Sequence, residues 1–309
     1  MNETMLARLG FVTIITVIVL LLKNVTVPSL AFISVATASS AVLVLTGTFS
    51  LQEMGDFIAE GVKGVHATAA LFIFSVLFFG IMTDVGMFDK IIGALMKKVG
   101  HNVIGVTLMT SIIAMIAHLD GAGAVTDVEI TAGGNVEEQT EAREYARPKL
   151  FWFNLILTLA VIVCLIFVKV PSYYVFMLGC AIALLVNFRG ASLQNKIIKS
   201  HAGPAIMMSS TILCAGVFLG VMEKTGIMNN MATVLAGFVP MSMGRFLPLI
   251  IGVLAGPLTL MFDTDSFFFG LMPVLIEIAG NFGVLPAHIA IVMVVCRNCA
   301  TFISPVVPA

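Results

Sequence analysis

Long apolar runs separated by short polar stretches fill most of this sequence. A helix that crosses a membrane needs about 20 mostly apolar residues. Runs that approach this length cover residues 5–22, 28–45, 65–82, 103–119, 150–168, 170–186, 204–222 and 246–262. Weaker apolar stretches follow at 267–278 and 288–307. The pattern predicts an all-α membrane protein with many spanning segments.

The composition supports the same conclusion. Hydrophobic residues make up 59% of the chain and charged residues only 11%, whereas a soluble domain keeps about a quarter of its residues charged. A chain of this kind needs lipid around it, so we expect neither a nucleic-acid partner nor a permanently bound cofactor. The sequence contains no His-Glu-x-x-His and no Gly-x-Ser-x-Gly motif, which disfavours an intramembrane or zinc-dependent enzyme.

One polar stretch, residues 127–149, interrupts the apolar pattern. It carries six carboxylates and three basic residues, with Gly133-Gly134 near its start. Such a composition is typical of a solvated linker. We interpret it as an acidic cytoplasmic linker that separates a first part, 1–126, from a second part, 150–309.

The two parts contain similar blocks. GIMTDVGMFDKIIGALMKKV occupies 80–99 and GVMEKTGIMNNMATVLAGFV occupies 220–239, at a constant offset of 140 positions. After Gly86 and Gly226 the same apolar positions recur at helical spacing. Each block predicts a spanning helix, a glycine break and an amphipathic helix that lies in the membrane interface. The two parts are therefore interpreted as repeats.

Basic residues indicate how these repeats are oriented, because they gather at the cytoplasmic ends of spans. The basic clusters at 90–98, 143–149 and 189–199 predict cytoplasmic ends, and Lys169 predicts an outer one. The matching spans at 65–82 and 204–222 then run in opposite directions. Inverted repeats of this kind are typical of secondary transporters, in which broken or re-entrant helices meet near the bilayer midplane.

Candidate site residues lie where polar side chains and helix breakers interrupt the apolar runs. They are Asp120, Gly121, Gly123 and Thr126 in the first part, and Asp263, Thr264, Asp265, Ser266, Asn298, Thr301 and Ser304 in the second. A solvated loop around Asp120 and a plain chain end after Asn298 are the alternatives. Three histidines fall at predicted span ends, where we expect them to be solvated: His66, His201 and His288.

The carboxylates at these positions favour a cationic ligand. An ionised carboxylate between apolar segments costs several kcal/mol unless it is paired, metal-bound or protonated. Asp263 and Asp265 are flanked by apolar residues on both sides, and carboxylates suit a proton or a hard cation. They have the wrong sign for a naked polyanion, so an anion carried through this site needs its charge masked.

Several segments carry a resemblance to a known family. They are GIMTDVGMFD (80–89), LDGAGAVT (119–126), RPKLFWFNLILTLAVI (147–162), YVFMLGCAIALLVN (174–187), LPLIIGVLAGPLTLMFDTDSFFFGLMPVL (247–275) and ATFISPVVPA (300–309). In these segments the chain resembles the citrate–divalent-metal:proton symporters, the CitMHS group of the ion transporter superfamily. The resemblance implies proton-coupled uptake of citrate complexed with Mg²⁺ or Ca²⁺ by a homodimer in the bacterial cytoplasmic membrane. Asp263 and Asp265 are the candidates for contact with the metal of that complex.

The chain also departs from this family. At the first tip, Ala122, Ala124 and Val125 stand where an acid and hydroxyls are common in the family. The returning limb of the first hairpin and the two spans expected after it are missing, and the chain stops within the last predicted broken helix. We therefore expect an internally deleted and C-terminally truncated form. Two alternatives stay open: a carrier of another carboxylate or anion of the same superfamily, and a membrane remnant that does not transport.

Overall fold

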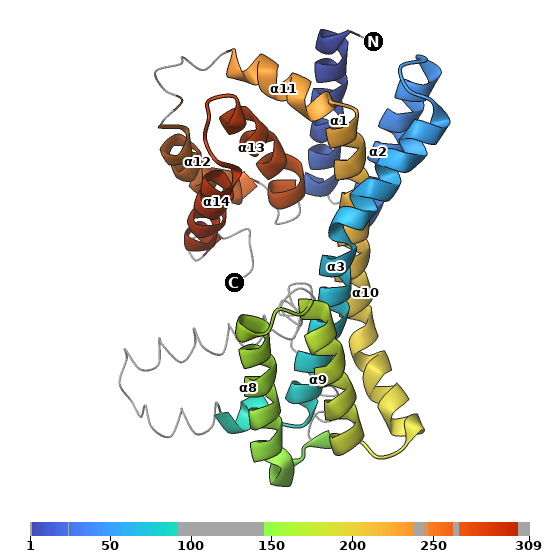
Figure 1. Ribbon diagram of the computed structural model, residues 1–309, viewed down its shortest axis with the longest axis vertical. Coiled ribbons are helices and arrows are strands. Elements are labelled where there is room, and N and C mark those ends of the chain that lie inside the picture. The colour runs from blue at the N-terminus through green and yellow to red at the C-terminus, as the bar shows by residue number, and fades with distance from the viewer. Residues whose placement is uncertain are drawn as a thin grey trace. The chain divides into compact units, whose positions relative to one another are not determined.

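The computed structural model describes residues 2–23, 25–91, 145–237, 244, 246–261 and 266–301. In these ranges every regular element is a helix (Figure 1). The first three are α1 (Glu3–Leu22), α2 (Pro28–Leu45) and α3 (Leu51–Asp84). The next group is η2 (Pro148–Leu150), α8 (Phe151–Phe167), α9 (Ser172–Asn187), α10 (Ala191–Lys224) and α11 (Ile227–Ala236). The last group is α12 (Leu247–Met261), η4 (Ser266–Leu271), α13 (Met272–Gly280) and α14 (Pro286–Thr301).

The predicted all-α membrane architecture is confirmed. Five helical segments in the described ranges are long and apolar enough to cross a membrane: α1, α2, α3, α10 and the segment Pro148–Phe167 that joins η2 to α8. The predicted spans at 170–186 and 246–262 appear as the shorter helices α9 and α12. The predicted span at 103–119 lies outside the described residues.

α3 and α10 are longer than the apolar runs that predicted them. Each contains 34 residues, so both helices begin before positions 65 and 204, where the predicted apolar spans begin. Charged residues near the starts of the helices, such as Glu53 of α3 and Lys196 of α10, lower the hydropathy but favour helix. A capping box also fixes the start of α3: the Ser50 N–H donates to Glu53 Oε2 at 2.8 Å, and the Glu53 N–H donates to Ser50 Oγ at 3.2 Å.

The chain forms two compact units. Unit 1 consists of residues 1–65 and 211–309, and unit 2 of residues 66–210. One half of α3 and one half of α10 belong to unit 1, and the other halves belong to unit 2. Each unit therefore combines segments from both predicted repeats, because the long helices are shared.

Unit 1 contains two hydrophobic clusters. One joins α1, α2 and α11 to the unit 1 halves of α3 and α10, with Phe32 and Phe218 in ring contact at 5.5 Å. In this cluster α11 lies so close to α1 that a β-carbon on Gly10 would overlap Met231. The second cluster joins α12, η4, α13 and α14. α12 and α14 are in close contact there, since Gly252 faces Val292.

Unit 2 packs α8 and α9 against the unit 2 halves of α3 and α10. Phe78 and Phe79 of α3 both contact the ring of Phe176 on α9, each with ring centroids 5.8 Å apart. Two buried amides join α8 to α9: Asn154 Nδ2 donates to Asn187 Oδ1 at 2.9 Å, and Asn187 Nδ2 donates to Asn154 Oδ1 at 2.8 Å. Such reciprocal bonds hold helices together in lipid, where apolar burial alone does not.

Both predicted glycine breaks are present. Gly86 follows α3 with a φ of 73°, and Gly226 follows α10 with a φ of 72°. A side chain is strained in this left-handed region, so glycine is the residue that turns the chain there. Helix resumes at once after both glycines. After Gly226 it forms α11, which buries one face through Ile227, Met228, Met231 and Ala232.

Candidate functional site

Most of the predicted site residues lie outside the described part of the chain. This holds for Asp120, Gly121, Gly123, Thr126, Asp263, Thr264, Asp265 and Ser304. Ser266 is the first residue of η4, and Asn298 and Thr301 belong to the last turns of α14, where the backbone alone is described. The ligand shell at the two tips therefore stays a prediction.

The helices on either side of the second tip are described. α12 ends at Met261 and η4, a π-helix, begins at Ser266. The four residues 262–265, which include Asp263 and Asp265, thus connect the carboxyl end of one helix to the amino end of the next. A helix leaves its last carbonyls and its first N–H groups without intrahelical partners. Single π-helical turns also occur frequently at functional sites.

The aromatic residues after the tip are firmly packed. Phe267 has no exposed surface, and its ring contacts that of Phe268 at 5.4 Å in an edge-to-face arrangement. It belongs to the cluster formed by Leu247 and Ile251 of α12 with Ile289 of α14. The start of η4 is therefore anchored between the two helices that flank the predicted site.

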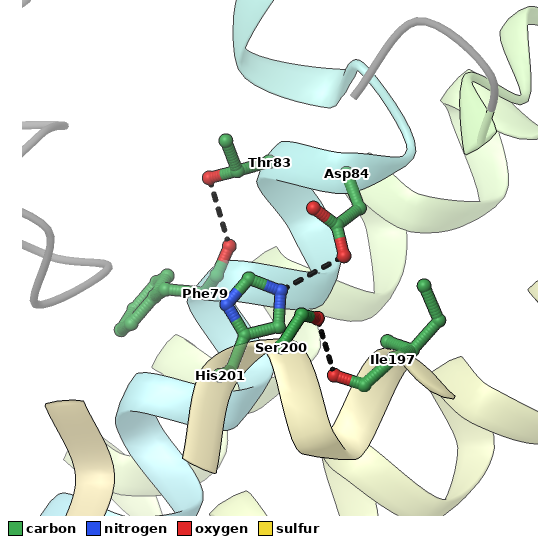
Figure 2. Close-up of polar contacts among 6 residues, drawn as sticks. All are labelled: Phe79, Thr83, Asp84, Ile197, Ser200 and His201. Carbon is green, nitrogen blue, oxygen red and sulfur yellow. Dashed lines mark hydrogen bonds and ion pairs between the residues drawn. The ribbon is translucent and has the colours of Figure 1, made fainter. Parts of the chain in front are cut away.

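A polar pair that the sequence did not predict lies in unit 2, where α3 meets α10. His201 Nε2 lies 2.8 Å from Asp84 Oδ2, and the two side chains are only 19% and 15% exposed. Figure 2 shows the imidazole directed from α10 toward the last turn of α3. Gly80 provides the space, since a β-carbon there would overlap the ring. The solvated position predicted for His201 was therefore wrong: a partner 117 positions away covers it.

Two neighbouring hydroxyls form hydrogen bonds within their own helices. Thr83 Oγ1 donates to the Phe79 carbonyl at 3.0 Å, and Ser200 Oγ donates to the Ile197 carbonyl at 2.7 Å (Figure 2). The contact between α3 and α10 at this point includes the His201–Asp84 pair, and the absence of a side chain at Gly80 makes room for it.

In unit 1, α3 meets α10 through glycines instead. A β-carbon on Gly61 would overlap the Gly216 carbonyl, and one on Gly220 would lie 2.5 Å from the Phe57 carbonyl. Gly216 and Gly220 form a Gly-x-x-x-Gly motif, which lets helix backbones approach closely in membranes. An ion pair between Lys224 and Glu60, 2.7 Å apart, follows one turn beyond and is about half exposed.

These contacts repeat at the sequence offset of 140. Gly80 meets His201 in unit 2, and the residues 140 positions away, Gly220 and Gly61, meet in unit 1. The Ser209 hydroxyl donates to the carbonyl of Ala69 at 3.0 Å, and these two residues are themselves 140 positions apart. α3 and α10 also share the offset at both ends. The offset between the two sequence blocks therefore recurs in the contacts between α3 and α10.

In the described ranges no three histidine, cysteine, aspartate or glutamate side chains come together to hold a metal ion. The predicted tips therefore remain the candidates for cation contact.

Comparison with known proteins gives full-length relatives. The chain is 25% identical to the Mg(2+)/citrate complex secondary transporter of Bacillus subtilis and 26% identical to the citrate transporter of the same organism. Either alignment covers 99% of this chain and 90% of the relative. An uncharacterized transporter of Bacillus subtilis, YraO, is 25% identical over 93% of this chain and 86% of its own length. No family profile and no solved structure matches.

The first alignment is longer than this chain. It extends over 394 positions, whereas the chain has 309 residues. At least 85 aligned positions of the relative therefore have no counterpart here. An internally shortened chain gives an alignment of this kind.

Proposed function

We propose that this chain, a transporter of the CitMHS type, carries citrate across the cytoplasmic membrane as a complex with a divalent metal ion. Similarity over nearly the whole length to two relatives named as citrate transporters is the observation that carries the proposal. The all-helical architecture with membrane-length helices is what a secondary transporter needs.

The chemistry of the second tip supports a complexed substrate. Bound magnesium cancels two of the three negative charges of citrate, so the complex meets carboxylates with far less repulsion than the free anion does. Mg²⁺ and Ca²⁺ both take carboxylate and hydroxyl oxygens as ligands. Asp263 and Asp265 supply the former, and Thr264 and Ser266 supply the latter. The metal enters as part of the substrate rather than as a resident cofactor.

We further propose that one of these aspartates contacts the metal while the other cycles a proton. Burial favours the neutral form of a carboxylic acid, so a carboxyl at a dry midplane site can carry a proton when no cation is bound. Uptake should then rise as the external pH falls and should collapse with a protonophore. The inverted repeat, supported by the contacts at offset 140, would expose this site alternately to either side. A homodimer remains part of the proposal through the family resemblance.

The test uses uptake of labelled citrate into proteoliposomes. Asp263→Asn and Asp265→Asn should each reduce metal-dependent uptake at least tenfold, because an amide neither neutralises a divalent ion nor releases a proton. Glu277→Gln is the matched control, since Glu277 lies on α13 beyond the tip and is partly exposed. Normal uptake by both Asn variants, with equal amounts of folded protein, would remove the second tip from the mechanism.

A second function is favoured by a specific observation. At least 85 aligned positions of the Mg(2+)/citrate relative have no counterpart in this chain. If the shortening falls at 120–150, as the sequence predicts, the first tip lacks its returning limb. The chain would then be a membrane protein that binds the complex without carrying it. Binding of citrate in the presence of Mg²⁺ without uptake would identify this case.

A further inference from the structure

Unit 2 concentrates positive charge at one of its ends. We call this the basic end: it consists of Lys90, Arg147, Lys149, Arg189, Lys196 and Lys199. All of these side chains are exposed except that of Arg147, which is partly buried. The acidic residues described at the same end are Asp84, which is paired with His201, and the exposed Asp89. The basic end therefore carries a clear excess of positive charge over the described acids.

Contacts between elements show that these cations belong to a single surface. The Arg147 N–H donates to the Val85 carbonyl after α3, at 3.0 Å. Its Nε donates to the carbonyl of Asn187 at the end of α9, at 3.4 Å. Lys196 on α10 donates to the Tyr145 hydroxyl at 2.6 Å. The ends of α3 and α9 and the starts of α8 and α10 therefore meet here, as the lower part of Figure 1 shows.

Two of the cations lie over aromatic rings. Lys90 Nζ is 4.2 Å from the centre of the Phe151 ring, and the Arg147 guanidinium lies 5.8 Å from the centre of the Phe188 ring. A ring face attracts a cation without neutralising it, so the charges of Lys90 and Arg147 stay available to an outside anion. We call these two ring contacts the cation seats.

The opposite end of unit 2 carries no such surface among the described residues. The turn between α8 and α9 carries a single charged residue, the exposed Lys169. A positive end of this kind orients a membrane protein during insertion. Orientation during insertion depends on the charges alone and does not require that the folded protein place them on aromatic rings. The ring contacts therefore indicate that these cations also have a role after insertion.

We propose that the basic end binds the headgroups of anionic phospholipids in the adjacent leaflet. Clusters of lysine and arginine next to spanning helices attract anionic lipids by about 1 kcal/mol per cation, or roughly fivefold in affinity. The lipid phosphate meets Lys90 and Arg147, while the acyl chains lie along the exposed apolar face of α8. That face includes Ile156 and Leu159, which are 63% and 53% exposed.

The chain carries its own reporter of this binding. Trp152 is its single tryptophan. It is 69% exposed, and its ring contacts that of Phe151, the seat of Lys90, at 5.5 Å. A lipid bound at the basic end must place its first acyl carbons beside this indole. Brominated acyl chains quench tryptophan fluorescence on contact, so no label on the protein is needed.

The experiment reconstitutes the full chain in phosphatidylcholine bilayers with increasing phosphatidylglycerol, with bromine on only one of the two lipids. The quenching should show that phosphatidylglycerol binds beside Trp152 with at least fivefold higher affinity than phosphatidylcholine does. High salt should reduce that preference, because screening weakens exposed charges. Equal quenching by the two brominated lipids would overturn the proposal.

Variants assign the preference to the seats. Lys90→Gln should reduce it about fivefold, and Lys90→Arg should retain it, since arginine keeps both the charge and the ring contact. Lys169→Gln, at the other end of unit 2, is the matched control and should leave it unchanged. A preference that survives the double substitution of Lys90 and Lys149 by glutamine, or that falls equally with Lys169→Gln, would refute binding at the basic end.

Discussion

The two places where α3 meets α10 occupy equivalent positions in the predicted repeats, yet they are built differently. In unit 1 the helix backbones touch through Gly61, Gly216 and Gly220. In unit 2 one glycine, Gly80, faces the imidazole of His201, which pairs with Asp84. Equivalent positions therefore need not keep equivalent chemistry: one contact depends on missing side chains and the other on a polar pair.

This difference affects how each contact tolerates change. A carbonyl oxygen on a neighbouring helix cannot move aside unless the helix itself shifts, whereas an imidazole can take another rotamer. The unit 1 contact should therefore be rigid and intolerant of added volume. A single substitution at the unit 2 contact should lower stability only slightly, and a second substitution at the partner residue should restore part of the loss.

The largest effect is expected for Gly220→Ala. The new β-carbon would lie 2.5 Å from the Phe57 carbonyl, and overpacking of this kind costs about 1–3 kcal/mol or more. The thermal midpoint in detergent should fall by several degrees. Gly64→Ala on α3 is the control, because a β-carbon there has no atom within 4 Å. That variant should be neutral or slightly stabilising, since alanine favours helix over glycine.

A smaller and reversible effect is expected for Gly80→Ala. The added methyl group displaces the His201 ring and separates it from Asp84, and a lost hydrogen bond costs about 1 kcal/mol. The double variant Gly80→Ala with His201→Ala should be more stable than the sum of the single effects predicts, because the overlap is gone. Strict additivity of the two substitutions would show that Gly80 and His201 do not meet.

The smallest effect is expected for Glu60→Gln. The partner Lys224 is 41% exposed and Glu60 itself 58% exposed, and exposed ion pairs contribute little to stability. The thermal midpoint should not change measurably. A fall as large as that of Gly220→Ala would mean that the ion pair, rather than the glycine contact, holds the helices together in unit 1.

Local sequence pattern predicted the helices and the breaks but not the contacts between distant residues. Apolar runs located the spans, and the positions of Gly86 and Gly226 predicted the left-handed turns that the structure has. Hydropathy missed the polar starts of α3 and α10, because it measures affinity for lipid rather than for helix. No local pattern encodes which residues meet across more than a hundred positions, so the His201–Asp84 pair was missed.

The importance of the buried amides of α8 and α9 could have been predicted from the sequence. Asn154 and Asn187 each stand within an otherwise apolar run, and a polar side chain inside a spanning helix needs a partner. This sequence pattern identifies the two asparagines but does not show which residue each of them contacts. The cation seats were visible only in part, since basic residues and aromatics lie close together in the sequence at 145–152. Their pairing through space required the structure.

Transport of a metal–citrate complex is tested most directly by uptake of labelled citrate into proteoliposomes that contain the unmodified chain, with Mg²⁺ present and with Mg²⁺ removed by a chelator. We predict uptake in the presence of Mg²⁺ that falls at least tenfold when the metal is removed, because only the complex has its charge masked. Uptake of free citrate at the same rate without any divalent ion would contradict the account.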